Sequence, residues 1–286
     1  MKTAIAWGLA GVLAMGAAAC SSPEEAREKV GVYDSGLDGD GSVAVPQPPA
    51  PPAPPPAEAV DFTDNAKQGE AARDFAYGWP KQASAIPPLA AMLSERRDDA
   101  LSQQKKEWDE ALAEFGPEGC ISCTNREYSL EWKLVTDTPR FLSLSGEGYL
   151  YTGGAHGMPL LDTLVWDREA RAGEGDTVAV MDMFTSADAI TAAVQGPFCA
   201  ALDKERKERR GEYYEPGGMF TECPGLDELV ILLGSSNKKA INRIGLIAPP
   251  YVAGPYVEGS YEVTVPVTSA VLDAVKPRYK DAFAVQ

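Results

Sequence analysis

The amino-acid sequence predicts an α+β fold, in which an antiparallel sheet packs with a long N-terminal helix of the domain and with further helices. Two observations support this prediction. Apolar residues recur at helical spacing in some segments and alternate with polar residues in others. The helical and extended segments also follow one another without the regular alternation of βαβ units. Residues 60–286 are long enough for one large domain or for two small ones that share a core.

The first strong element is a helix that begins at Pro87 or Pro88, because proline suits the first turn of a helix. Gly116-Pro117 is expected to end it. Its apolar residues recur at helical spacing: Leu89, Leu93, Leu101, Trp108, Leu112 and Phe115. A helix of this length exceeds the usual globular helix, so a break within residues 96–99 is an alternative.

Extended segments follow this helix. Alternating apolar residues predict strands at residues 128–134 and 142–144, and an apolar run predicts a third at residues 160–166. A turn is expected at residues 168–175. Sequence of this kind is typical of an antiparallel sheet whose two faces differ in polarity.

Helical sequence returns after residue 185. Helices are predicted at residues 186–194 and 198–210, and Gly196-Pro197 is expected to separate them. The last part of the chain is expected to form three strands and an amphipathic helix, at residues 229–233, 241–248, 261–267 and 269–275.

The first twenty residues have the pattern of a secretory signal peptide. Lys2 supplies a positive charge, residues 4–19 are apolar, and small residues precede Cys20. With Cys at the first mature position, the segment resembles a bacterial lipoprotein signal, in which the thiol takes a diacylglyceryl group. We therefore expect residues 1–19 to be removed and Cys20 to be the lipid attachment. An ordinary signal peptide with a Cys near its cleavage site is the alternative.

The segment after Cys20 indicates how the protein is anchored. Ser21 and Ser22 follow the Cys without an Asp, which the lipoprotein resemblance relates to the outer membrane facing the periplasm. No later stretch has the roughly 18 consecutive apolar residues of a bilayer span, so the lipid is expected to be the membrane attachment. Residues 20–59 form a predicted tether, whose proline-rich part at residues 46–56 favours a polyproline II spacer of about 34 Å.

The net charge of the chain disfavours some classes of binding partner and favours others. It has 26 basic and 42 acidic residues and a formal net charge of −16. Such a surface repels the phosphate backbone, so nucleic acid is not expected as a partner. It attracts cations and basic proteins, although solubility alone also accounts for an acidic composition.

Four cysteines remain beyond Cys20 in what is expected to be an oxidising compartment, and they allow three pairings. We prefer the pairing of Cys199 with Cys223. In the chain-entropy model, closing that loop stabilises the folded protein by about 3.5 kcal/mol, whereas pairing Cys120 with Cys123 stabilises it by about 1.9 kcal/mol. The Cys120 pair has CxxC spacing, so a redox role is the alternative. A thioredoxin-like site would require that pair at a strand-to-helix junction.

The sequence contains no complete catalytic constellation, so an enzyme is not expected. His156 is the only histidine, which excludes a multi-histidine zinc site, and no metal or other cofactor is expected. No GxSxG motif is present to supply an exposed nucleophilic serine. Carboxylates are abundant, however, and a glycan-cleaving hydrolase that uses acidic residues with His156 remains the alternative.

Two segments are candidates for ligand binding. The first, residues 149–157, places Tyr151, Gly153 and Gly154 before His156 at a predicted strand end. We call its residues 151–157 the Gly-His loop. Its histidine either binds a ligand or hydrogen-bonds the neighbouring backbone to fix the turn.

The second segment, residues 248–259, is so rich in proline and glycine that it predicts an exposed, shaped loop, here called the Pro-Tyr loop. Its Tyr251 and Tyr256 are suited to stacking on sugars or to anchoring a protein partner. Packing of both tyrosines against the sheet is the alternative.

Together these motifs carry a family resemblance. The Gly-His loop, an apolar strand with residues 182–184 after it, and then residues 250–256 resemble the extracytoplasmic domain, of unknown function, shared by the anti-sigma factor RsiV and the peptidoglycan deacetylase PdaC. The resemblance would cover residues 60–286, with a less distinctive part at 60–145 and the two motifs within 146–286. It implies an α+β fold and, for the anti-sigma factor, capture of lysozyme.

The chain also departs from those relatives. It lacks the deacetylase metal-binding Asp/His set and a cytoplasmic anti-sigma segment, so neither activity is expected here. The sequence therefore predicts a non-catalytic envelope lipoprotein that binds peptidoglycan, an envelope protein or a basic lysozyme-like protein.

Overall fold

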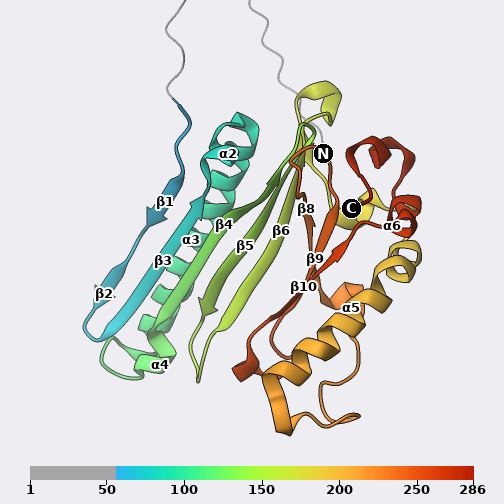
Figure 1. The fold of residues 1–286 in the computed structure, drawn as a ribbon. Coiled ribbons are helices and arrows are strands. Elements are labelled where there is room, and N and C mark those ends of the chain that lie inside the picture. The colour runs from blue at the N-terminus through green and yellow to red at the C-terminus, as the bar shows by residue number, and fades with distance from the viewer. Residues whose placement is uncertain (1–55) are drawn as a thin grey trace, which may run out of the picture. The chain divides into compact units, whose positions relative to one another are not determined.

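The computed structural model describes residues 56–286, which form two sheets with a long helix on the outer face of each (Figure 1). The first sheet consists of β1 Val60–Thr63, β2 Ala66–Gln68, β3 Ala71–Trp79, β4 Arg126–Asp137, β5 Phe141–Tyr151, β6 Met158–Asp167 and β7 Asp176–Thr177. Its order is β1-β3-β4-β5-β6-β7, with β2 paired to β3. The predicted α+β class is confirmed.

One pair of this sheet is parallel, which the prediction of an antiparallel sheet did not include. β3 and β4 run parallel, whereas the other pairs are antiparallel. The chain between them crosses over through α2 Lys81–Ser84, α3 Pro87–Phe115 and α4 Ile121–Thr124. A parallel pair needs such a crossover, because a short hairpin can join only antiparallel strands.

Helix α3 occupies the range that its apolar spacing predicted and continues without a break through residues 96–99. It buries Leu89 and Leu93 in its first half and Trp108 and Ala111 in its second. Because both halves pack on the molecule, tertiary contacts support a helix longer than the usual one. Gly116, at φ 71°, ends it.

Strands β1 to β3 were missed by the sequence prediction, which began with the helix. β3 carries the signal of a half-buried strand, because Phe75, Tyr77 and Trp79 alternate and are all buried. They pack with α3 and with residues of β4 and β5 in one hydrophobic core.

The second sheet is antiparallel and has the order β10-β9-β8, from β8 Val230–Gly234, β9 Arg243–Ala248 and β10 Tyr261–Pro266. Its helices are α5 Ala187–Arg210 and α6 Ser269–Ala274. Short 3-10 helices lie at Arg171–Gly173, Val180–Met183, Gly211–Tyr213, Leu226–Glu228, Tyr256–Glu258 and Pro277–Ala282. Strand β8 contacts β4, β5 and β6, which joins the two sheets.

The predicted separation of two helices at Gly196-Pro197 is wrong, because α5 continues through Pro197 as one helix. Its buried residues Ile190, Val194, Phe198 and Leu202 form one stripe across both halves and belong to the core of the second sheet. Proline removes one backbone hydrogen bond, but continuous burial of the stripe outweighs that loss.

The predicted signal peptide, the lipid attachment at Cys20 and the proline-rich part of the tether, except Pro56, lie outside the described residues. Within residues 56–286, no helix has the length and apolar character that crossing a membrane requires.

Candidate functional site

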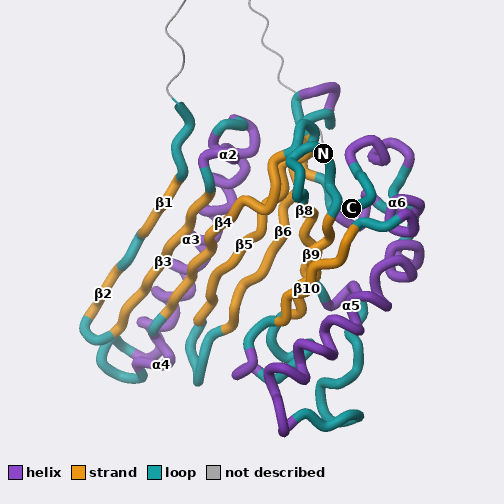
Figure 2. The backbone as a smooth tube through the Cα atoms, viewed as in Figure 1, coloured by secondary structure: helices purple, strands orange, loops and turns teal. Residues whose placement is uncertain are grey.

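The Gly-His loop and the Pro-Tyr loop meet at one end of the described domain. The first joins β5 to β6 and the second joins β9 to β10, and Figure 2 shows these loops side by side. The ring of His156 lies 4.5 Å from that of Tyr256, centroid to centroid, and Tyr256 lies 5.8 Å from Tyr251. The two candidate segments therefore form one aromatic surface, which we call the His-Tyr cluster (His156, Tyr251 and Tyr256).

Glycine gives the Gly-His loop its shape. Gly153 and Gly154 have φ angles of 105° and 97°, which side-chain-bearing residues rarely adopt. This backbone lets Gly154 N–H donate to Ser122 O at 2.8 Å. The hydroxyl of Tyr151 lies 2.7 Å from Gly154 O and 3.1 Å from Ser122 O, as donor to both. The loop thus rests on the segment that contains Ser122.

His156 is exposed and is held by its neighbours. Its Nδ1 lies 2.9 Å from Gly157 O, while Gly157 N–H donates to the hydroxyl of Tyr149 at 2.8 Å. With the hydrogen on Nδ1, His156 donates to that carbonyl and its Nε2 is the acceptor. Among the described residues, no hydrogen bond or ion pair joins His156 to a carboxylate.

The Pro-Tyr loop presents Tyr251 to solvent. Tyr251 has φ 71°, a left-handed conformation that is strained for a residue with a bulky side chain. Its backbone N–H donates to Gly254 O at 2.8 Å, and its side chain is 49% exposed. Tyr251 therefore does not pack against the sheet, contrary to the alternative in which both tyrosines do.

The hydroxyl group of Tyr256 lies beside that of Tyr149. Partial burial, followed by the proximity of the Tyr149 hydroxyl, raises the pKa of Tyr256. The two tyrosine rings of the cluster present hydrogen-bonding edges beside apolar faces.

Buried Arg206 of α5 supports the Pro-Tyr loop from below. Only 1% of the residue is exposed, and its Nε donates to Ala253 O at 2.8 Å. Its two other nitrogens donate to Thr221 O at 3.3 Å and Glu222 O at 3.1 Å. Burial lowers the pKa of this guanidinium. One cation thus holds two loops against the helix.

Two further arginines of α5 fix the end of the Pro-Tyr loop. Arg210 pairs with both carboxylate oxygens of Glu258, at 2.9 and 3.0 Å. Arg209 donates to Glu258 O at 2.8 Å and to Ser260 O at 2.9 Å. Burial raises the pKa of Glu258, but hydrogen bonds from Arg210 and Tyr261 outweigh it and leave the pKa below its ordinary value.

The cysteines pair as preferred from the sequence. Cys199 of α5 bonds to Cys223, which ties the segment after α5 back to the helix, and Cys120 bonds to Cys123. Disulfides of this kind are typical of extracytoplasmic domains. The Cys120 pair follows α3 and a turn and leads into the four-residue α4, so it lacks the strand-to-helix junction that a thioredoxin-like site requires.

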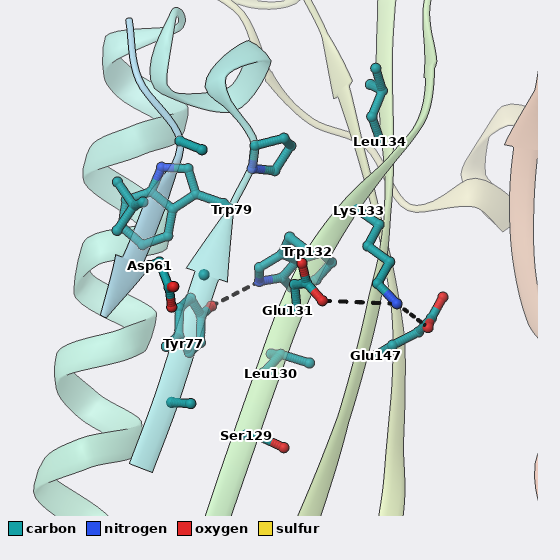
Figure 3. Close-up of a pocket in the computed structure, with 15 residues that line it drawn as sticks. Asp61, Tyr77, Trp79, Ser129, Leu130, Glu131, Trp132, Lys133, Leu134 and Glu147 are labelled. Carbon is teal, nitrogen blue, oxygen red and sulfur yellow. Dashed lines mark hydrogen bonds and ion pairs between the residues drawn. The ribbon is translucent and has the colours of Figure 1, made fainter. Parts of the chain in front are cut away.

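A second concave region lies between the carboxyl ends of β3 and β4 (Figure 3). It has a volume of about 730 Å³, and Tyr77 and Trp132 form part of its lining. Lys133 lies at one wall, 2.6 Å from Glu147. This groove was not predicted from the sequence, because β1 and β3, which line it, were not predicted.

The structure brings Tyr151, Gly153, Gly154, His156, Tyr251 and Tyr256 together, with the Cys120–Cys123 segment beneath the Gly-His loop. Tyr149 and Glu258 lie in the two predicted segments, but no supporting role was predicted for them. The other supporting residues were not predicted: Ser122, Arg206, Arg209 and Arg210. The arginines lie in a highly charged helical run at residues 203–210, which reads as a solvated surface. Within residues 56–286, no group of three or more His, Cys, Asp or Glu side chains is arranged to hold a metal ion.

Comparison with known proteins gives a family match for part of the chain. Residues 67–159 match the family described as "Deacetylase PdaC". The match contains the Gly-His loop and ends before the Pro-Tyr loop. It confirms the resemblance to the PdaC-type family that the sequence motifs indicated. No curated protein matches this chain.

The solved structures that this chain matches include two proteins of the DUF3298 family. One, from Pseudomonas aeruginosa PAO1, is 17% identical, with 81% of this chain and 98% of that chain covered and a TM-score of 0.46. The other, from Bacteroides fragilis NCTC 9343, is 13% identical, with 73% of this chain and 89% of that chain covered and a TM-score of 0.42.

Proposed function

We propose that this domain is a non-catalytic envelope module that binds peptidoglycan through the His-Tyr cluster. The observation that carries the proposal is the convergence of His156, Tyr251 and Tyr256 on one surface, from segments far apart in the sequence. Tyrosine rings offer apolar faces for sugar rings and hydroxyl groups for their polar edges. Arginines of α5 hold the Pro-Tyr loop in place, so little order must be gained on binding.

A binding role is favoured over hydrolysis by the surroundings of His156. Its described polar contact is with the adjacent backbone carbonyl, and no carboxylate contacts it to form an acid–base pair. The hydrolase alternative predicts soluble sugar fragments from peptidoglycan and their loss in a His156→Ala variant. Intact glycan after prolonged incubation with the domain would dismiss that alternative.

We further propose that the domain is carried on a lipid anchor at Cys20, at the outer membrane and facing the periplasm. Residues 20–59 would then connect the lipid to the binding domain. Wild type is expected to incorporate radioactive palmitate, and a Cys20→Ala variant is expected to lose that label. A wild-type protein without label, or an equally labelled variant, would contradict lipid attachment.

Co-sedimentation with purified peptidoglycan sacculi tests the binding proposal, using residues 56–286, which lie within one compact unit. Wild type is expected to pellet with the sacculi, and Tyr256→Ala and Tyr251→Ala to bind at least about tenfold more weakly, as for loss of a stacked aromatic anchor. Tyr213→Ala is the matched control, because Tyr213 is 81% exposed and makes no aromatic contact with another described residue. Equal binding by all four proteins would contradict the proposed site.

A basic envelope protein, such as a lysozyme-like one, is the second candidate ligand. The net charge of −16 and the 89% exposed Val257 of the same loop favour a protein surface of opposite charge. Three results together would select this ligand. The domain would not bind sacculi, it would capture hen lysozyme more weakly as the salt concentration is raised, and the Tyr256→Ala variant would not capture lysozyme.

A further inference from the structure

The second half of β4 has a free edge. β4 pairs with β5 from Glu127 to Asp137, with a bulge at Val135, but with β3 only from Arg126 to Glu131. Within the described residues, no strand pairs with residues 132–137 on the β3 side. Backbone groups that point to that side have no ladder partner, and such an edge is a template for another strand. Six residues of free edge correspond to about 20 Å of extended chain.

A groove with a volume of about 730 Å³ begins at this edge, where Trp132, Lys133 and Leu134 line it, and extends over β3 to β1 (Figure 3). It lies where β3 ends at Trp79, and small residues such as Ala76 and Ser129 line it. These small side chains leave room over the sheet for a ligand backbone. The volume is within the range of ligand sites in proteins.

A hydrogen bond between two buried side chains lies at the floor of this groove. Tyr77 is 2% exposed, and its oxygen accepts a hydrogen bond from Trp132 Nε1 at 3.0 Å. This bond joins β3 to β4 beside the point where their pairing ends.

The walls of the groove carry an excess of negative charge. Asp61 of β1 and Glu131 of β4 lie on opposite walls, as Figure 3 shows, and both are exposed. Lys133 Nζ lies 2.6 Å from Glu147 Oε2 and 3.9 Å from Glu131 Oε2, so Lys133 pairs chiefly with Glu147. Three carboxylates thus face one ammonium. This balance suits a basic ligand and disfavours an acidic one.

We propose that this groove docks an extended segment of a partner protein, which adds a strand to the free edge of β4 and places a lysine or arginine between Asp61 and Glu131. Main-chain hydrogen bonds to residues 132–137 supply affinity, and the two carboxylates supply selectivity. The groove is a site separate from the His-Tyr cluster, so this inference does not depend on the proposed function.

The test uses the purified mature chain and a fluorescent, acetylated octapeptide of alternating threonine and valine that carries two lysines. Its affinity is measured by fluorescence anisotropy, beside a peptide with glutamate in place of lysine. The lysine peptide is expected to bind at least about tenfold more tightly, since pairing opposite charges favours it and like charges repel the other. Hydrogen exchange is expected to slow at the amides of residues 132–137 when it binds.

Variants connect that binding to the groove. Asp61→Lys and Glu131→Lys are each expected to weaken binding of the lysine peptide at least about tenfold, because each reverses the charge of one wall. Glu110→Lys on α3 is the matched control, because its side chain is 66% exposed and does not line the groove. Any of three results would overturn the proposal: no saturable binding up to about 1 mM, equal affinity for both peptides, or slowed exchange only outside residues 132–137.

Discussion

The two loops of the His-Tyr cluster are held at the same surface by different kinds of interaction. The Gly-His loop is held by neutral hydrogen bonds, from Gly154 N–H and the Tyr151 hydroxyl to Ser122 O. The Pro-Tyr loop is held by charged side chains of α5, with Arg206 buried beneath it. Neutral bonds each contribute little, whereas removing one partner of a buried polar group leaves the others unpaired. The position of the Pro-Tyr loop should therefore depend more strongly on single side chains and on pH.

The largest expected effect on stability is that of removing a disulfide, and the two disulfides are expected to differ. Replacing Cys199 and Cys223 by serine should lower the free energy of unfolding by about 3.5 kcal/mol, and replacing Cys120 and Cys123 by about 1.9 kcal/mol, because the longer loop restricts the unfolded chain more. Urea denaturation of the two double variants measures both. A larger loss for the Cys120 pair would reverse the comparison.

Arg206→Met should lower the free energy of unfolding by about 3 kcal/mol. The change removes the donor of Thr221 O and Glu222 O and one of the two donors of Ala253 O, which keeps Arg210 Nη2 at 3.2 Å. Each lost hydrogen bond from this charged group costs about 1 kcal/mol or more. Urea denaturation at pH 7 is the measurement. Lys204→Met on the same helix is the control, because that side chain is 79% exposed, and it should change stability by less than about 0.5 kcal/mol. Equal effects would show that Arg206 does not support the loop.

The Glu258–Arg210 pair should make the Pro-Tyr loop sensitive to acid. The pKa of Glu258 is lower in the folded protein than its ordinary value of 4.5. Its contribution to stability is therefore complete above that ordinary value and is lost as the pH falls through the folded-state pKa. Glu258→Gln should reduce stability by about 2 kcal/mol at pH 7 and flatten its dependence on pH below 4.5. A variant with the wild-type pH profile would exclude this role.

Tyr149→Phe should have the smallest effect, because it removes one neutral acceptor from the Gly-His loop. Gly157 N–H would lose its partner at 2.8 Å, with a loss of about 1 kcal/mol in the free energy of unfolding. Thermal denaturation of this variant, beside Tyr213→Phe as the exposed control, measures the difference. A loss as large as that of Arg206→Met would remove the distinction between the two loops.

Local sequence patterns predicted most of the secondary structure, and the exceptions have physical causes. Pro197 predicts a break, but a buried stripe along α5 continues past it. The parallel pairing of β3 with β4 follows from the crossover through α3, which alternation of apolar residues does not encode. Alternation in β3 itself was present in Phe75, Tyr77 and Trp79 and would have revealed that strand.

The candidate site was predictable in its parts but not in its assembly. Dense glycine and proline indicated both loops, because they require special backbone angles. That His156 meets Tyr256 depends on the packing of one sheet on the other, which no local pattern specifies. Arg206 was unpredictable for a related reason, since its burial depends on the loop that covers it.

The most direct test of a single His-Tyr cluster uses the fact that His156 is the only histidine. Its ring protons can be observed by proton NMR without assignment of the rest of the chain. With the Tyr256 ring centred 4.5 Å away, they are expected to be displaced from unfolded-peptide positions by the ring current, and to return toward them in Tyr256→Leu. Unfolded-peptide positions in the wild type, unchanged in the variant, would contradict the account.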